Sequence, residues 1–124
     1  MSVPNVEAVG MHHWGPKQLL LTDMYVLYPE VTNPEDPNAV AVHELKPTRT
    51  KRAYLSREWA KIIQPVLVHT TMAFLKVCEP AVVLVYEKGP QHNCTAFLKC
   101  THFQKQFLEL CFTNKGISYN IQEQ

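Results

Sequence analysis

A proline-bounded carboxylate is the first feature of the sequence that could bind a ligand. Asp36 lies between Pro34 and Pro37 in the stretch EVTNPEDPNAVAV, and Asn33 and Asn38 flank this segment. Proline fixes its own φ and restricts the residue before it, so the backbone around the carboxylate has few conformations. A carboxylate held in this way can accept a hydrogen bond from a hydroxyl group and would repel a phosphate. The alternative is that Asp36 only caps its own turn.

Aromatic and imidazole side chains follow one another at His12, His13 and Trp14. The face of an indole ring can stack on a nucleobase, an interaction worth roughly 1–3 kcal/mol in proteins that bind single strands. The alternative for Trp14 is a place in the core or at the end of a barrel. Because adjacent residues of a strand point to opposite faces, His12 and His13 are not expected to share a metal ion. We expect no metal and no other cofactor.

The densest group of positive charges consists of Lys46, Arg49, Lys51 and Arg52. They fall in the segment KPTRTKR, residues 46–52, which we expect to form a loop or the tip of a hairpin. Such a loop can follow a phosphate backbone, or it can be a solvated tip without a ligand. The formal net charge is only +1, which excludes a protein that coats nucleic acid by bulk attraction and leaves a local patch.

No motif in the sequence indicates catalysis. The four glycines do not form a phosphate-binding loop, and there is no nucleophile elbow. The scattered Asp and Glu residues lack the arrangement of a two-metal nuclease. We therefore expect a binding module rather than an enzyme, with a metal-dependent hydrolase as the weakest alternative.

Short strands, with two helices among them, must position these residues. Strands are expected at residues 6–11, 19–27, 39–45, 53–55, 82–86, 95–101 and 117–121. The hydrophobic fraction of 46% is sufficient for a core, and residues 1–124 contain no repeat or linker, so we expect a single domain. The order of elements predicts a mainly β, α+β domain. It is either a small barrel of the oligonucleotide-binding type with two inserted helices or another α+β fold.

Two stretches have the end signals and the apolar periodicity of helices. Ser56 can cap the first helix, and Pro65 is expected to kink or stop it near Gln64. The apolar face of this first helix comprises Trp59, Ile62, Ile63, Val66 and Leu67. The second helix is expected at residues 102–113, with Gly116 at its end. The apolar side of the second helix comprises Phe103, Phe107, Leu110 and Cys111.

The cysteines and the first residues of the chain indicate a compartment. Cys78, Cys94, Cys100 and Cys111 include no pair at the C-x-x-C spacing of zinc or redox sites, so we expect free thiols in a reducing environment. The first residues lack the basic and apolar regions of a signal peptide, and no apolar run approaches the ~20 residues of a membrane span. We expect an intracellular protein without a membrane partner, nuclear if the source is a eukaryote.

Three segments together resemble the HIRAN family, a small domain of post-replication repair translocases. They are AVGMHHWG at residues 8–15, NPEDPNAVAV at residues 33–42 and AYLSREWAKIIQPVL at residues 53–67. The second segment is the most specific, because it reads as asparagine-proline-x-aspartate-x-asparagine-alanine leading into a strand. The resemblance covers most of the chain and implies a modified oligonucleotide-binding barrel with added helices.

The resemblance also implies an activity, the capture of a single-stranded DNA 3′ end with its 3′-hydroxyl in DNA repair and replication-fork processing. Asp36 matches the family aspartate that accepts the hydrogen bond of this hydroxyl. His12, His13 and Trp14 match a basic and aromatic stretch, and Tyr54 matches a position whose side chain can stack or meet phosphate. The expected DNA-binding residues are His12, His13, Trp14, Asn33, Asp36, Tyr54, Lys51 and Arg52.

Three positions depart from the family pattern. His12 stands in place of an arginine, Glu35 in place of a tyrosine, and Cys94 where an aromatic side chain would help to hold a base. Glutamate cannot stack and repels phosphate, and neutral histidine contacts phosphate less well than a guanidinium does. These departures leave an alternative, a protein-interaction domain on the same barrel with an eroded DNA site. The expected partners are single-stranded DNA 3′ ends and repair proteins, bound by a monomer.

Overall fold

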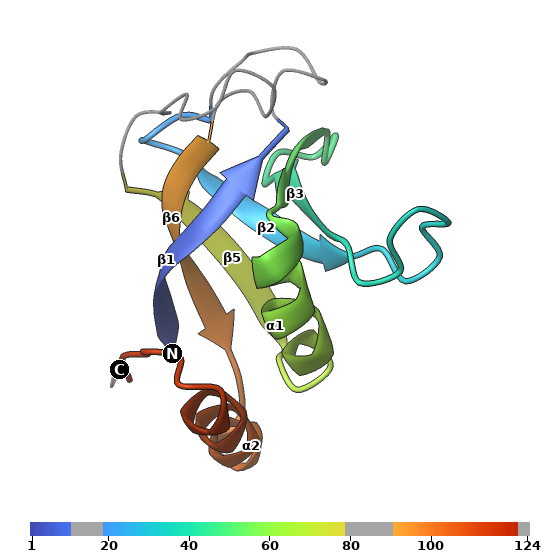
Figure 1. Ribbon diagram of the computed structural model, residues 1–124. Helices are drawn as coiled ribbons and strands as arrows, with labels where there is room; N and C mark the ends of the chain where they lie inside the picture. The colour runs from blue at the N-terminus through green and yellow to red at the C-terminus, as the bar shows by residue number, and fades with distance from the viewer. Residues whose placement is uncertain (11–18, 79–90, 122–124) are drawn as a thin grey trace.

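The computed structural model of the protein describes residues 1–10, 19–78 and 91–121. Within these residues, six antiparallel strands form a closed barrel in the order β1-β4-β3-β2-β5-β6 (Figure 1). The strands are β1 (Ser2–Val9), β2 (Met24–Pro29), β3 (Val40–Glu44), β4 (Lys51–Leu55), β5 (Met72–Val77) and β6 (Gln91–Lys99). The helices α1 (Arg57–Leu67) and α2 (His102–Asn114) follow β4 and β6. The prediction of a mainly β barrel with two helices is confirmed.

The barrel closes because β1 bends between two partners. Most of β1 pairs with β6, and Ala8 and Val9 pair with β4 as well. One extra residue of β1 between Val3 and Val6 forms a bulge, in which Asn5 has a φ of 63°. Asparagine adopts this left-handed conformation more readily than most residues. The bulge supplies the bend that a strand needs in order to close a barrel.

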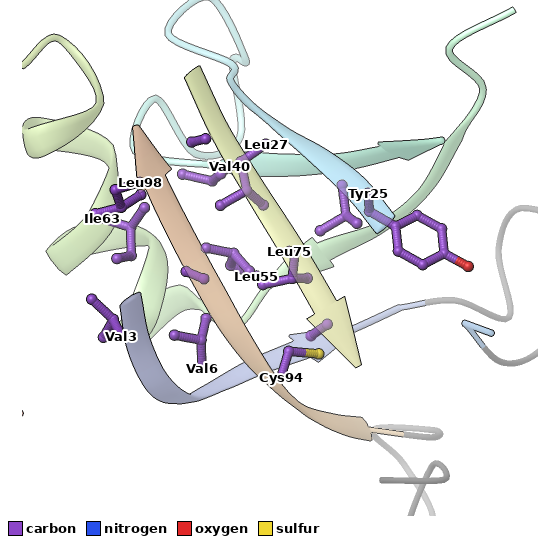
Figure 2. Packing of buried hydrophobic residues seen from close by; sticks show 14 of the residues in the cluster. Val3, Val6, Tyr25, Leu27, Val40, Leu55, Ile63, Leu75, Cys94 and Leu98 are labelled. Carbon is purple, nitrogen blue, oxygen red and sulfur yellow. The ribbon is translucent and has the colours of Figure 1, made fainter. Parts of the chain in front are cut away.

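The interior of the barrel is filled by alternate side chains of its strands. Along β6 every second residue from His92 to Leu98 is buried, and β5 alternates in the same way. Figure 2 shows labelled side chains that point toward one another from the strands and α1: Val3, Val6, Leu27, Val40, Leu55, Ile63, Leu75, Cys94 and Leu98. Cys94 is fully buried in this core. The expectation that residue 94 lies beside a base is therefore wrong, because its place in the alternation directs it inward.

The first helix begins at its predicted cap. Ser56 Oγ accepts a hydrogen bond from the Trp59 backbone N–H at 3.4 Å. The helix continues through Pro65 to Leu67, so it does not stop near Gln64. The proline lies close to the end of the helix, where it removes a single backbone hydrogen bond. Burial of Val66 and Leu67, the two residues after the proline, stabilises the last turn.

The second helix has its predicted bounds to within one residue. Thr101 Oγ1 accepts from the Gln104 backbone N–H, and the Gln104 side chain accepts in return from the Thr101 N–H, which completes a capping box. At the other end Gly116 adopts a φ of 68°, and its N–H donates to the Thr113 carbonyl at 3.1 Å. Gly116 therefore ends the helix as predicted. Neither helix among the described residues is long and apolar enough to cross a membrane.

The face through which α2 packs differs from the prediction. The helix lies at the end of the barrel where β1 begins (Figure 1). Only a narrow stripe of it, Leu108 and Phe112, enters the core. Of the predicted apolar side, Phe103, Phe107 and Leu110 are exposed, and Cys111 is partly buried against the core. Apolar periodicity located the helix, but the position of the barrel decides which side is covered.

The strand predictions include one wrong strand, one wrong start, one omission and one untested strand. The strand predicted at residues 19–27 begins only at Met24, after a turn at residues 21–22. Residues 117–121 make a single bridge, between Ser2 and Asn120, instead of a strand. The sequence MAFLKV of β5 was not predicted as a strand, because it consists mainly of good helix formers in isolation. Its pairing with β2 and β6 overrides that preference. The strand predicted at residues 82–86 lies outside the described residues.

Candidate nucleic-acid interface

The corner between β2 and β3, residues 30–39, is folded around the side chain of Asn33. Asn33 Oδ1 accepts hydrogen bonds from the backbone N–H groups of Glu35 at 2.9 Å and of Asp36 at 3.2 Å. Its Nδ2 donates to Glu30 Oε1 at 3.2 Å. Asn33 thus uses both ends of its amide inside the corner. Its observed role is to hold the backbone that presents Asp36.

Asp36 itself caps the second half of the corner. Its Oδ1 accepts a hydrogen bond from the Asn38 N–H at 3.0 Å, and its backbone carbonyl accepts from the Ala39 N–H at 3.0 Å. The capping interpretation of this residue is therefore confirmed. The side chain is only partly buried. Its Oδ2 accepts no hydrogen bond from the part of the chain that the structure describes, so this oxygen can still take a hydroxyl donor.

Glu30 joins the corner to β4. Its Oε2 lies 2.6 Å from Lys51 Nζ, and its Oε1 accepts from the Tyr54 hydroxyl at 2.7 Å. Lys51 Nζ also donates to the Tyr54 oxygen at 2.8 Å. A continuous hydrogen-bond network therefore runs from the Asp36 backbone through Asn33 and Glu30 to Tyr54 and Lys51. It brings together four of the residues that the sequence predicts for DNA binding.

A bulge in β4 puts Lys51 and Tyr54 on the same face of the barrel. Residues three apart on a regular strand point to opposite faces. In β4, however, one extra residue stands opposite β3 between Lys51 and Ala53. This extra residue shifts the alternation of side chains, so Lys51 and Tyr54 point to the same face. The extra residue, Arg52, donates from its Nε to Glu44 Oε1 at 2.8 Å.

The predicted basic cluster is therefore divided. Lys51 and Arg52 belong to β4 and not to the loop expected at residues 46–52. Both are paired with an acid, Glu30 and Glu44 respectively. Lys46 remains exposed in the loop between β3 and β4. A phosphate backbone that approaches β4 would meet partly neutralised cations instead of a dense positive patch.

The contacts within the network also shift the titration of its charged groups. Burial acts to raise the pKa of Glu30, but hydrogen bonds from Lys51, Tyr54 and Asn33 outweigh it and hold this pKa below the usual value of 4.5. Burial acts to lower the pKa of Lys51, but its bonds to Glu30 and Tyr54 raise that pKa above 10.5. Both shifts favour the charged forms, so the ion pair is intact at neutral pH.

Two tyrosines lie on the outer face of β2, β3 and β4 beside this network. Tyr28 and Tyr54 pair with Ala41 from its two sides, so they are about 10 Å apart, two strand spacings. Ala41 between them is fully buried. Tyr28 is 37% exposed, and the ring of His43 meets it edge-on with the two centroids 4.8 Å apart. The arrangement offers two aromatic side chains on β2 and β4, the two strands that flank β3.

Sequence reasoning missed Glu30 and Tyr28. Glu30 contacts residues more than twenty positions further along the chain, and no local spacing marks it. Tyr28 reads as one aromatic residue of an ordinary strand until the register places it beside Tyr54. The predicted residues His12, His13 and Trp14 lie outside the described residues. Within residues 1–10, 19–78 and 91–121, no group of three His, Cys, Asp or Glu side chains could hold a metal ion.

Comparison with known proteins places the chain in a family. The model of the HIRAN domain matches residues 2–98, while no curated protein matches the sequence. Among solved structures, the HIRAN domain of human HLTF has a TM-score of 0.72 at 13% identity, with 97% of each chain covered. A protein from Lactobacillus plantarum has a TM-score of 0.55 at 17% identity, over 77% of this chain and 95% of that one.

At these identities the two solved structures show that the fold is shared. The family assignment rests on the HIRAN match, which covers β1 to β6 with the corner and α1 between them. The chain therefore belongs to the HIRAN domain family, a family of DNA-binding modules.

Proposed function

We propose that this chain captures single-stranded DNA 3′ ends by their 3′-hydroxyl. The observation that carries the proposal is that the two oxygens of the Asp36 carboxylate differ in their hydrogen bonding. One oxygen is bound by the Asn38 N–H, and the other has no partner among the described residues. A 3′-hydroxyl can donate to this second oxygen, whereas a 3′-phosphate would be repelled by it. The site then selects the end of a strand over its interior.

Tyr54 supports the proposal because its orientation is fixed before DNA arrives. Its hydroxyl is held by Glu30 and Lys51, so little side-chain entropy is lost when a base stacks on the ring. The terminal base stacks on Tyr54 and the preceding base on Tyr28. His12, His13 and Trp14 complete the site according to the family pattern.

Within a longer protein, such a module would direct an attached translocase or nuclease to DNA ends at replication forks. In a eukaryote this role belongs in the nucleus. The module itself needs no catalytic group for this purpose, since its contribution is to bind and position the end.

Fluorescence anisotropy with 5′-labelled oligonucleotides tests the proposal. Two oligonucleotides of one sequence, ending in a 3′-hydroxyl or a 3′-phosphate, are compared at fixed salt because phosphate contacts make affinity salt-dependent. We expect the wild-type chain to prefer the hydroxyl end. The variant Asp36→Asn keeps an oxygen for the Asn38 N–H but places an amide donor at the second position. It is therefore expected to fold normally and to lose the preference.

Glu35→Gln is the matched control. It removes a negative charge from the adjacent, exposed residue of the same corner and leaves Asp36 unchanged. We expect its preference for the hydroxyl end to persist. Equal affinities of the wild-type chain for both ends would refute end capture. Absence of binding to either would favour the protein-interaction alternative on the same barrel.

A further inference from the structure

A second surface of the barrel, separate from the corner, forms an apolar groove. The groove has a volume of about 880 Å³ and is lined by residues of β2, β5, β6 and the first turn of α2. Phe74 and Phe97 stand directly opposite each other in the β5–β6 pairing and line it together. Their neighbours Ala73 and Leu98 are buried in the core, so the alternation of each strand directs the two phenyl rings outward. None of its described lining residues belongs to the corner.

The edges of the groove are apolar side chains left in contact with solvent. Met24 and Leu45 are both exposed, at 37% and 42%, although each lines the groove. Large apolar side chains gathered around one depression indicate a surface that another molecule covers. Methionine is flexible and polarisable, and it adapts well to the side chains of a partner. A groove of this volume lies within the size range of pockets that hold ligands.

Positive charge surrounds this apolar surface. Lys99 and Lys105 both line the groove, and no acidic residue is among its described lining. Lys76 follows on β5, where it pairs with Met24 of β2 and is exposed. A ligand that fits must therefore combine apolar groups with negative charges at their margin.

Lys99 lies at one edge of the apolar surface. Its Nζ lies 5.7 Å from the centroid of the Phe74 ring, in cation–π contact. Around these two side chains the lining is mainly aliphatic, with Met24, Leu45 and Ile121 exposed at its edges. Aliphatic side chains of a ligand can pack against them and against the lysine stem. The groove thus fits the apolar and acidic side chains of a peptide.

We propose that this groove binds an acidic amphipathic segment of a partner protein. Apolar side chains of the segment pack over Phe74 and Phe97, while its carboxylates pair with Lys99 and Lys105. This interaction is independent of the corner, so DNA and the partner can be bound at the same time.

Selection from a random displayed peptide library tests the proposal. The library is selected on the wild-type chain and depleted on the variant Met24→Asp, which changes an exposed groove residue. We expect the enriched peptides to combine large apolar residues with Asp or Glu. The best synthetic peptide is then measured by fluorescence anisotropy on the double variant Lys99→Glu/Lys105→Glu. The affinity of this peptide for the double variant should be at least about tenfold lower than for the wild-type chain. The same peptide with its acids changed to Lys should bind the double variant more tightly than it binds the wild-type chain.

Lys61→Glu, at an exposed position of α1, is the matched control and should bind the acidic peptide normally. A 3′-hydroxyl oligonucleotide should not compete with the peptide. Failure to enrich peptides, enrichment of basic peptides or unchanged binding by the double variant would overturn the proposal. If the oligonucleotide competes with the peptide on the wild-type chain but not on the double variant, the proposal would also be overturned. The groove would then be assigned to nucleic acid. Circular dichroism of each variant confirms that loss of binding is not loss of fold.

Discussion

Asp36 owes its position to its neighbours more than to its own contacts. The backbone N–H groups of Glu35 and Asp36 donate to Asn33 Oδ1. The Asp36 carboxylate accepts from the Asn38 N–H. The prolines on either side narrow the conformations that the unfolded chain must lose. A single carboxylate is thus presented on a stiff corner. One of its oxygens accepts a hydrogen bond from the Asn38 N–H, and the other accepts none from the described residues. The position of the Asp36 carboxylate therefore depends on the neighbouring residues Asn33, Pro34, Pro37 and Asn38.

Under the proposed function, Glu35 is the residue of the corner least suited to contact with DNA. It is exposed, carries a negative charge and cannot stack. We predict that Glu35→Tyr increases the affinity for a 3′-hydroxyl oligonucleotide by about tenfold or more, since stacking is worth roughly 1–3 kcal/mol per base. Anisotropy titrations of the wild-type chain and of Glu35→Tyr at one salt concentration check this prediction. Glu58→Tyr, at an exposed position of α1, controls for non-specific aromatic binding, and an equal gain there would contradict a role for the corner.

Tyr28 provides a prediction about the length of the bound strand. We expect Tyr28→Ala to lower the affinity for an oligonucleotide by about tenfold, through loss of one stacked base, and Tyr28→Trp to preserve it. The preference for a 3′-hydroxyl over a 3′-phosphate should survive in both variants, because Asp36 is unchanged. Phe103→Ala removes an aromatic ring that is 70% exposed on α2 and should have no effect. A Tyr28→Ala variant with wild-type affinity would remove Tyr28 from the DNA path.

At the scale of elements, the bulge of β4 determines how the corner is anchored. One extra residue turns Lys51 toward Glu30 and Tyr54, and it leaves Arg52 to pair with Glu44. Without the bulge, Lys51 and Tyr54 would point to opposite faces. The corner would then lose its ion pair with Lys51 and keep the Glu30–Tyr54 hydrogen bond, its own turns and its contact with α1, whose Gln64 donates to the Pro37 carbonyl. The bulge therefore adds Lys51 to the contacts that couple the corner to β4.

A double-mutant cycle on Glu30 and Lys51 measures this coupling. With Glu30→Gln and Lys51→Met, we predict an interaction energy of about 1 kcal/mol at pH 7, at the upper end for pairs near the surface. Because the folded-state pKa of Glu30 is lowered, its contribution is present above the usual value of 4.5 and is lost as pH falls through the lowered value. The pKa of Lys51 is raised, so its contribution is present below 10.5 and is lost as pH rises through the raised value.

Urea denaturation at several pH values gives the interaction energy of the cycle. Glu58 of α1 and Lys115, the residue that follows α2, are both exposed and form a control cycle with an expected coupling near zero. A coupling for Glu30 and Lys51 that is independent of pH between neutral and strongly acidic conditions would contradict the ionic character of the contact.

The distance along the chain between the residues that form a feature separates what the sequence could predict from what it could not. Caps at Ser56 and Gly116 and the corner around Asp36 depend on residues a few positions apart, and local patterns located them. The packing side of α2, the strand status of β5 and the partners of Lys51 depend on the barrel as a whole. Periodicity cannot supply a bulge, and a bulge decides the orientation of every side chain beyond it.

For the whole molecule, the buried thiol of Cys94 reports the integrity of the barrel. Burial raises its pKa to about 12 and excludes solvent from it. We predict that Cys94 reacts with iodoacetamide only through global unfolding, whereas the exposed Cys78 reacts rapidly in the native state. Peptide-level mass spectrometry during a denaturant series distinguishes the two sites. Reaction of Cys94 at the rate of Cys78 under native conditions would contradict a closed barrel.

The bridge between Ser2 and Asn120 has a consequence for architecture. Each residue donates its N–H to the carbonyl of the other at 2.8 Å, so the first strand and the segment after α2 meet at one point (Figure 1). A polypeptide that enters at residue 2 and leaves at residue 120 needs a single attachment point on a host protein. Such a barrel can be carried as an insertion in one surface loop, and it should tolerate circular permutation with the two ends joined by a short glycine linker.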